Sequence, residues 1–327
     1  MCIRDRYAPL DDNVKRNIES LQGVYNLCTT SPLYFIKRGE PLFLKASEMV
    51  SLAEEKRCSL GEIALMYEST LLKLPEKSII KEMEHRYNIM RESVFQGLKE
   101  NPPSMRLLHP CAGKVYNSEK EGKTAIGGLH TRAAARAMAA LHINCGMGIV
   151  CAAPTGGSAG VIPGVLVTLA EEKNLSLERT IYSLLAAGGI GLIVAERATF
   201  AAEVAGCQVE IGAATAMASA AVVEAAGGSP QQAIDAAAIS FQNTMGSVCD
   251  LVQGTVEIPC HTRNATGASS AFVCADLILG GYENPVSLDE TIDAVYSTGK
   301  MLPAELRCTS LGGLAVTPSA KSMKPIK

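Results

Sequence analysis

The stretch SLLAAGGIGLIVA, residues 183–195, is among the longest apolar runs of the chain and decides its fold class. It is shorter than the roughly 20 residues that a membrane-spanning helix needs, and the charged pair Glu196-Arg197 ends it. Much of it is alanine and glycine, and the same composition extends over residues 125–275. Because glycine inside a helix costs up to about 1 kcal/mol relative to alanine, its repeated use suits helices that approach closely or border a site. We expect buried helices of a soluble protein.

Helix start signals recur on both sides of this run. Ser59-Leu60-Gly61-Glu62 is typical of a capping box, and Ser229-Pro230-Gln231-Gln232 adds proline at the first helical position. Ser287-Leu288-Asp289-Glu290 predicts a third start, and Gly246 and Gly299 are expected near the ends of the last two helices. Segments with period-two alternation are scarce. The sequence therefore predicts a mostly α fold, with a doubly wound α/β fold as the alternative because short apolar runs can also be strands.

The chain is expected to hold one catalytic domain preceded by a short extension. Residues 1–40 are interpreted as an N-terminal extension, and residues 41–327 as a single helical domain, since no Pro/Ser-rich linker interrupts them. The opening Met1–Arg6 resembles translated adapter sequence rather than a natural start. Residues 1–34 show no apolar stretch of a signal peptide, which favours the cytoplasm.

Composition and net charge argue against several classes of protein function. The 327 residues carry a net charge of −3, which gives no bulk electrostatic case for binding nucleic acid or an anionic membrane. The 11 cysteines are an odd count in a long chain, which is unlike a secreted disulfide scaffold. This usage indicates a reducing compartment in which thiolates serve as ligands or nucleophiles.

Three cysteines have the surroundings of cluster ligands. Cys207, Cys249 and Cys260 each lie beside Gly, Pro or a polar break, where the backbone can turn and free its N–H groups. No CxxC pair is present, so a zinc-finger interpretation fails. Three soft thiolates far apart in sequence are able to bind an iron–sulfur cluster. The alternative is that each is an inert buried thiol, because free cysteine is among the most buried residue types.

A glycine-rich turn and one histidine are the other candidates. Residues 153–160, APTGGSAG, join two apolar segments, and the exposed N–H groups of such a turn suit a carboxylate or phosphate. The turn lacks the lysine of a P-loop, and a plain inter-helix turn is the alternative. His130 follows Gly127-Gly128 at a helix start, where it is a candidate general base or simply a hydrogen-bonded surface residue.

Taken together, these segments resemble the α chain of the iron–sulfur-dependent L-serine dehydratases, or L-serine ammonia-lyases. The similarity runs from about residue 40 to the end, and several linked motifs are far more specific than any one alone. The motifs that carry it are Ala153–Gly164, Ala198–Phe200, Gly206-Cys207-Gln208 with Glu210 and Gly212, Cys249-Asp250 with Gly254, Pro259-Cys260 with Arg263-Asn264, and Thr309 with Gly312–Ala315 and Thr317-Pro318.

The resemblance implies a cofactor and a reaction. It implies that Cys207, Cys249 and Cys260 hold a [4Fe-4S] cluster with one iron free of cysteine, which acts as a Lewis acid when water is removed from L-serine to give pyruvate and ammonia. It implies that the substrate is bound by Thr155, Gly156, Gly157 and Ser158, with Asn264 orienting it. No pyridoxal phosphate is expected.

Departures from the family pattern leave choices open. The segment Leu108–Lys114 stands where many relatives have Ser-Gly-Gly-Asp-Ala, which leaves L-cysteine or another small amino acid as an alternative substrate. The family's small β domain is not found, so we expect a separate β chain, and the base then comes from that chain, from His130 or from Lys114. Cys308 could cap the fourth iron at rest, and Cys111 is a candidate neighbour of the site. A subunit that is inactive without its partner, in a homo- or hetero-oligomer, is the remaining alternative.

Overall fold

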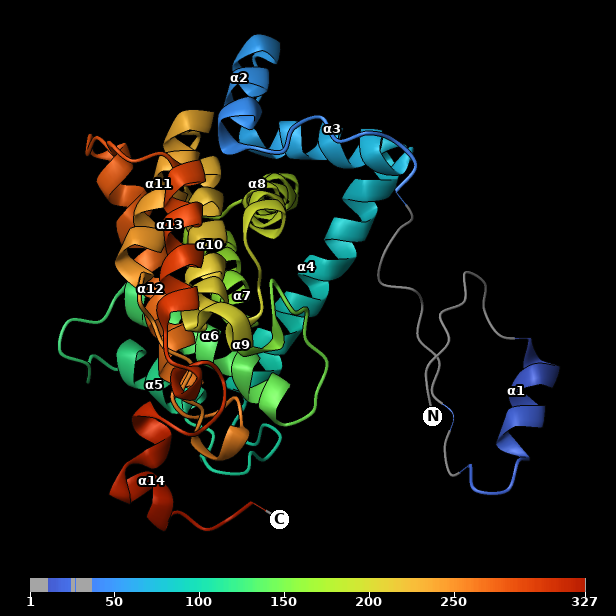
Figure 1. The fold of residues 1–327 in the computed structure, drawn as a ribbon, viewed down its shortest axis with the longest axis vertical. Coiled ribbons are helices and arrows are strands. Elements are labelled where there is room, and N and C mark those ends of the chain that lie inside the picture. Colours follow the sequence, from blue (N-terminus) through green and yellow to red (C-terminus); the bar gives the residue numbers. More distant parts are fainter. Residues whose placement is uncertain (1–10, 25–26, 28–36, 327) are drawn as a thin grey trace.

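The structure, a computed structural model, describes residues 11–24, 27 and 37–326. Part of the predicted N-terminal extension lies outside the described residues. That part includes the opening Met1–Arg6, with Cys2, and also Cys28. Within the described residues the chain forms helices and no strand (Figure 1). The mostly α prediction is therefore confirmed, and the doubly wound alternative is excluded.

Within the part of the chain that the structure describes, fourteen α-helices and five short 3-10 helices follow one another. Their bounds are α1 Asp12–Glu19, α2 Ala46–Lys56, α3 Leu60–Leu72, α4 Glu76–Leu98, α5 Ala112–Lys120, α6 Leu129–Cys145, η1 Gly156–Ser158, α7 Val161–Glu172, α8 Leu177–Arg197, α9 Ala202–Ala205, η2 Cys207–Val209, α10 Ile211–Ala226, α11 Pro230–Thr244, η3 Val252–Gly254, α12 Cys260–Leu279, α13 Leu288–Met301, η4 Ala304–Leu306, η5 Gly313–Val316 and α14 Pro318–Ser322.

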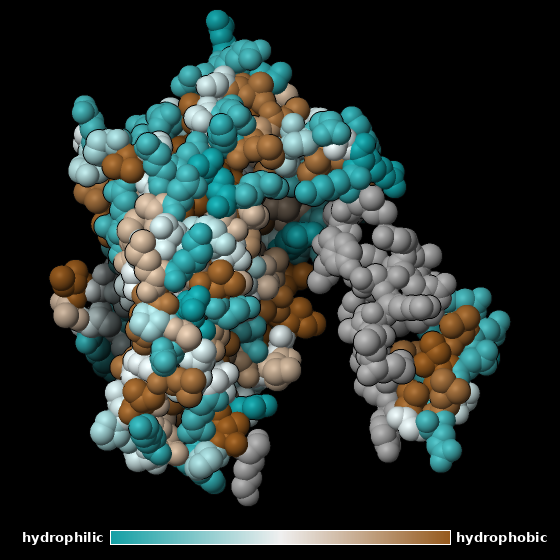
Figure 2. Space-filling view, viewed as in Figure 1, coloured by the Kyte–Doolittle hydropathy of each residue, from teal (hydrophilic) through white to brown (hydrophobic). Residues whose placement is uncertain are grey.

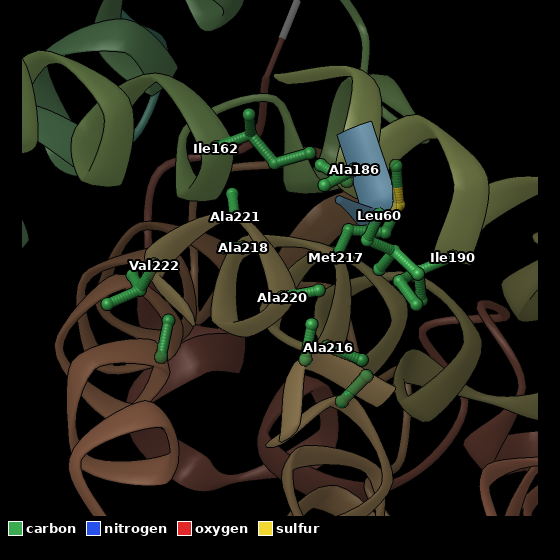
Figure 3. Packing of buried hydrophobic residues seen from close by; sticks show 14 of the residues in the cluster. Leu60, Ile162, Ala186, Ile190, Ala216, Met217, Ala218, Ala220, Ala221 and Val222 are labelled. Carbon is green, nitrogen blue, oxygen red and sulfur yellow. The ribbon is translucent and has the colours of Figure 1, made fainter. Parts of the chain in front are cut away.

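Helix α10 forms the centre of the fold. It packs against α7, α8, α11 and α12, and almost all of its residues are buried. A helix that is apolar on every side is stable only inside a core. Figure 3 shows its small side chains, such as Ala216 and Ala221, with Ile162 of α7 and Ile190 of α8 in the same core. The alanine-rich composition seen in the sequence therefore belongs to the central helix packing.

Glycines let the surrounding helices touch backbone to backbone. A Cβ atom added at Gly97 of α4 would overlap the carbonyl group of Ala139 in α6. At Gly164 of α7 it would lie 2.8 Å from the Cβ and backbone nitrogen of Ala137, again in α6. Real Cβ atoms do not approach so closely, so side chains larger than hydrogen are excluded at both positions. The close packing predicted from composition is thus present around α6, which leads to the site described below.

The predicted helix starts are confirmed. Ser59 and Ser229 each accept a hydrogen bond from the third helical residue, Glu62 or Gln232, whose side chain bonds back to the cap. The Ser287 hydroxyl caps α13 by accepting a hydrogen bond from the backbone N–H of Glu290. The predicted end of α13 at Gly299 is two residues early. Gly299 lies inside the helix because its missing Cβ lets α13 approach Ala205.

Two helices, Leu177–Arg197 and the segment Cys207–Ala226, are long and apolar enough to cross a membrane by length and composition. Within the fold, 67% and 83% of their most apolar windows are buried. Such burial is typical of core helices in a soluble protein. On the face shown in Figure 2, hydrophobic and hydrophilic residues are interspersed rather than arranged in an apolar belt.

Candidate active site

The three cysteines singled out from the sequence lie together in a small apolar cluster separate from the main core. Cys207 begins η2, Cys249 lies in the loop before η3, and Cys260 is the first residue of α12. Their exposed fractions are 2%, 1% and 4%, so all three thiols are buried. Segments up to 53 residues apart in sequence thus bring soft donors to one place, around Leu141 and Ile211.

Backbone contacts fix this arrangement. The N–H of Cys207 donates to the carbonyl of Ser247 at 2.9 Å. Gly206, at φ +74°, makes the turn before it, and a Cβ there would lie 2.7 Å from that same carbonyl. Cys249 donates to the carbonyl of Leu306 at 2.8 Å and accepts from the N–H of Cys308 at 2.8 Å. The motif near the C-terminus is therefore held against the cysteine loop.

The surroundings of the three thiols disfavour the charged thiolate form when no cation is bound. Burial raises the pKa of Cys207 to about 11, and it also raises the pKa values of Cys249 and Cys260. Arg263 opposes this effect, since its guanidinium hydrogen-bonds to Cys207 and lies within electrostatic reach of Cys260. Asp250 forms an ion pair with Arg263, with 2.9 Å between its Oδ1 and the guanidinium Nη2, and so orients it. Thiolates here need positive charge, which metal ligation supplies.

The chemistry of the donor set is compatible with an iron–sulfur cluster. Among the described residues, no three His, Cys, Asp or Glu side chains converge on one metal position. The thiolates that hold a cubane stand farther apart, at about 6–7 Å, because four irons lie between them. Buried, soft sulfur donors in an apolar pocket are the ligands that such clusters use. Cys207, Cys249 and Cys260 therefore meet the chemical requirement.

The glycine-rich turn lies beside these cysteines. The Thr155 hydroxyl donates to Glu210 Oε1 at 2.7 Å and lies 3.1 Å from the Ser158 hydroxyl. Gly156 and Gly157 form the first turn of η1, where helical N–H groups lack an intrahelical acceptor. Ser158 is fully buried, so its hydroxyl serves the turn itself, whereas Thr155 is half-buried at the edge.

Asn264 holds the turn rather than facing outward. Its side chain is fully buried. Its amide nitrogen donates to the carbonyls of Gly157 at 2.8 Å and Cys260 at 2.9 Å, and its oxygen accepts from the N–H of Gly160 at 3.0 Å. These bonds use both donor hydrogens. The geometry indicates a positioning role that joins the turn to the cysteine helix.

His130, one of the two residues proposed as bases, lies at the far end of α6 from the turn. Asn144, near the C-terminal end of that helix, donates through its side-chain amide to the carbonyl of Gly156 at 3.0 Å. His130 is about 21 Å from Asn144 along the helix axis. The ring of His130 instead contacts Ser269, 3.3 Å from its carbonyl oxygen. Lys114 is exposed in the first turn of α5 and makes no hydrogen bond or ion pair with another described residue. Among the described residues, no hydrogen bond or ion pair joins either residue to the cysteines.

Two further thiols pack against the cysteine cluster. Cys308 packs against the cluster and hydrogen-bonds to Cys249 through its side chain. Cys145 also packs there, and burial raises the pKa of its thiol to about 12. Its thiol donates to the carbonyl of Val256 at 3.2 Å. Cys111, by contrast, lies before α5 outside this cluster.

A buried carboxylate anchors the segment that departs from the family pattern. Glu257 is 2% exposed and accepts hydrogen bonds from the backbone N–H groups of Arg106, Leu107 and Leu108 at 2.7–2.8 Å. It stands three residues before Cys260. The loop leading into Leu108–Lys114 is therefore tied to the start of α12, although its residues differ from the expected motif.

Sequence reasoning missed the role of Glu210. It was noticed only as part of a motif, yet its carboxylate bonds to Thr155 and lies within electrostatic reach of all three cysteines. The available signal was an acidic residue between the apolar stretches 204–209 and 211–223. Fold and site together define an all-helical domain whose buried thiols adjoin an anion-suited turn.

Known proteins place this domain in a family. The family model described as "Serine dehydratase alpha chain" matches residues 49–315. The "Probable L-serine dehydratase, alpha chain" of Bacillus subtilis (strain 168) is 38% identical over 283 residues, which cover 86% of this chain and 94% of that protein. The "L-serine dehydratase, alpha chain" of Peptoniphilus asaccharolyticus is 34% identical over 280 residues, covering 85% and 96%. The chain belongs to the serine dehydratase alpha chain family and is an enzyme of the lyase type.

A third relative is longer. "L-serine dehydratase 1" of Escherichia coli (strain K12) is 32% identical over 283 residues, which cover 84% of this chain but only 62% of that protein. The chain therefore corresponds to about three fifths of this relative's length, and to nearly the whole of the two relatives named as alpha chains.

Proposed function

We propose that this chain is the catalytic subunit of an iron–sulfur-dependent L-serine dehydratase, which converts L-serine to pyruvate and ammonia. The observation that carries the proposal is the burial of Cys207, Cys249 and Cys260 in one cluster next to the Thr155 turn. The names of the relatives, which are L-serine dehydratases, support the reaction. When bound, the [4Fe-4S] cluster would supply an iron without a cysteine ligand, a Lewis acid suited to a departing hydroxyl group.

The chain's own residues prepare the site for a small amino acid. The free N–H groups of Gly156 and Gly157 suit the substrate carboxylate, while the Thr155 hydroxyl at the edge of the turn donates to Glu210. Asn264 keeps this turn at a fixed place relative to Cys260. Arg263 supplies positive charge beside the thiolates. These groups bind and orient; none of them is placed to remove the Cα proton.

We therefore assign the general base to a separate β chain. His130 contacts Ser269, Lys114 makes no hydrogen bond or ion pair with another described residue, and the two relatives named as alpha chains match this chain along nearly their whole length. The described cysteines are all free, which fits a reducing cytoplasm in which the cluster is also protected.

The proposal is tested by anaerobic assay of the reconstituted chain with L-serine, L-threonine and L-cysteine, each with and without the β chain. Pyruvate from L-serine that appears only, or much faster, when both chains are present is the expected result. Full activity of the single chain would remove the assignment of the base to the β chain. Faster sulfide release from L-cysteine than pyruvate formation from L-serine would replace the dehydratase with a desulfidase.

A further inference from the structure

Glu210 brings a negative charge into the site without a matching cation. The Glu210 side chain is partly buried, and burial raises the pKa of its carboxyl group, with nearby Glu203 adding to the rise. No Lys, Arg or His among the described residues forms an ion pair with it. Buried carboxylates are normally paired, because an unpaired charge in an apolar site is costly. Among the described residues, the site therefore contains no cation that balances this carboxylate.

The position of Glu210 points to the substrate as the source of that cation. Its Oε1 accepts from Thr155 and lies so near the turn that a Cβ at Gly157 would be 2.9 Å away. The same carboxylate also lies within electrostatic reach of Cys207, Cys249 and Cys260. It thus stands between the proposed carboxylate cradle and the thiols, where the Cα substituents of a bound amino acid would lie.

We propose that Glu210 binds the α-ammonium group of the substrate and so selects amino acids over the corresponding hydroxy acids. The inference rests on the proposed function, since it concerns the same site. Oε1 is held by the Thr155 hydroxyl, while Oε2 forms no hydrogen bond with a described residue. An ammonium donates hydrogen bonds and carries the missing positive charge, whereas a hydroxyl offers no charge. Thr155 fixes the carboxylate and is a positioning residue.

The test uses two unreactive ligands that differ only at this group, L-alanine with an ammonium and L-lactate with a hydroxyl. Both lack the β-hydroxyl and cannot eliminate water. Their dissociation constants are measured anaerobically by calorimetry on the full, cluster-loaded chain together with the β chain. Glu210→Gln is the informative variant, because its amide oxygen still accepts from Thr155 while the charge is gone. Unfolding temperature and iron content, matched to those of the unsubstituted chain, show that the turn and cluster survive.

We expect Glu210→Gln to weaken L-alanine binding by about ten- to a hundredfold, the usual range for a hydrogen bond to a charged group, and to change L-lactate binding only a few-fold. Glu210→Asp keeps the charge and should retain the preference for L-alanine, which preserves the test if the Gln variant does not fold. Equal weakening of both ligands, or no change in either, would overturn the assignment. Failure of the proposed function shows separately, as an unsubstituted chain that holds no cluster or leaves L-serine intact.

Discussion

At the scale of single residues, Asn264 connects the glycine-rich turn to helix α12, which begins with Cys260. It ties Gly157 and Gly160 of the turn to Cys260 of α12 through three hydrogen bonds, all in a fully buried place. A buried polar group left without its partner costs its full desolvation free energy. The local order of the turn therefore depends on one amide side chain.

Replacement of Asn264 by Ala should lower the free energy of unfolding by about 1–3 kcal/mol, because the N–H of Gly160 and the carbonyl of Gly157 lose their partner inside the protein. Chemical denaturation of the metal-free chain measures this loss. Thr266→Ala, on the exposed face of the same helix, is the matched control and should stay within about 0.5 kcal/mol. An equal effect of both substitutions would contradict the role given to Asn264.

Residue types and motifs predicted the site only in part. The cysteines and the turn were identifiable because soft donors and glycine-rich loops carry their chemistry locally. Glu210 was not identifiable as a site residue. Its lack of an ion-pair partner among the described residues depends on the fold, which the local sequence does not show. His130 looked suitable in its local sequence, yet the length of α6 carries it away from Asn144.

At the scale of helices, the contact between α4 and α6 depends on the absence of a side chain at Gly97. Gly97→Ala should lower the free energy of unfolding by about 1–3 kcal/mol, the cost of forcing extra atoms into a packed interior. Thermal or urea unfolding of the variant measures it.

Gly188, inside α8, is the matched control for this contact. A Cβ there meets no atom within 4 Å and its φ lies outside the left-handed region, so Gly188→Ala should leave stability unchanged or raise it by up to about 1 kcal/mol. Destabilisation of similar size at both glycines would mean that helix packing is not the cause.

Helix starts were predictable because their signals are local. Ser59 and Ser229 meet their partners three residues later, within the same turn. The end of α13 was not, because Gly299 continues the helix in order to approach Ala205, a residue of another element. A glycine in a sequence indicates either a stop or a close contact, and the choice between them depends on tertiary packing.

At the scale of the whole molecule, buried histidines make stability depend on pH. Burial, together with the ring of His261 whose centroid is 4.9 Å away, lowers the pKa of His142 from 6.5 to about 4. Between pH 6.5 and about pH 4, His142 binds a proton in the unfolded chain but not in the folded chain. Stability from this group is thus complete above pH 6.5 and is lost as the pH falls toward 4.

The loss from His142 should amount to about 3 kcal/mol over that range at most, from 1.36 kcal/mol per pH unit. Urea unfolding of the metal-free chain at several pH values measures it. His142→Leu should flatten the dependence between pH 6.5 and 4, whereas replacement of the exposed His85 by Gln should leave it as in the unsubstituted chain. An unaltered pH slope in His142→Leu would contradict the account.

The central claim is that three buried cysteines of one small cluster hold an iron–sulfur cluster, and anaerobic reconstitution with iron and sulfide tests it most directly. The unsubstituted chain should bind about four irons and four sulfides and gain the visible absorption of a cubane. Cys207→Ala should lose that absorption, while Cys274→Ala, an equally buried thiol of the main core, should retain it. A chain that takes up no cluster, or a Cys207→Ala variant that loads as fully as Cys274→Ala, would contradict it.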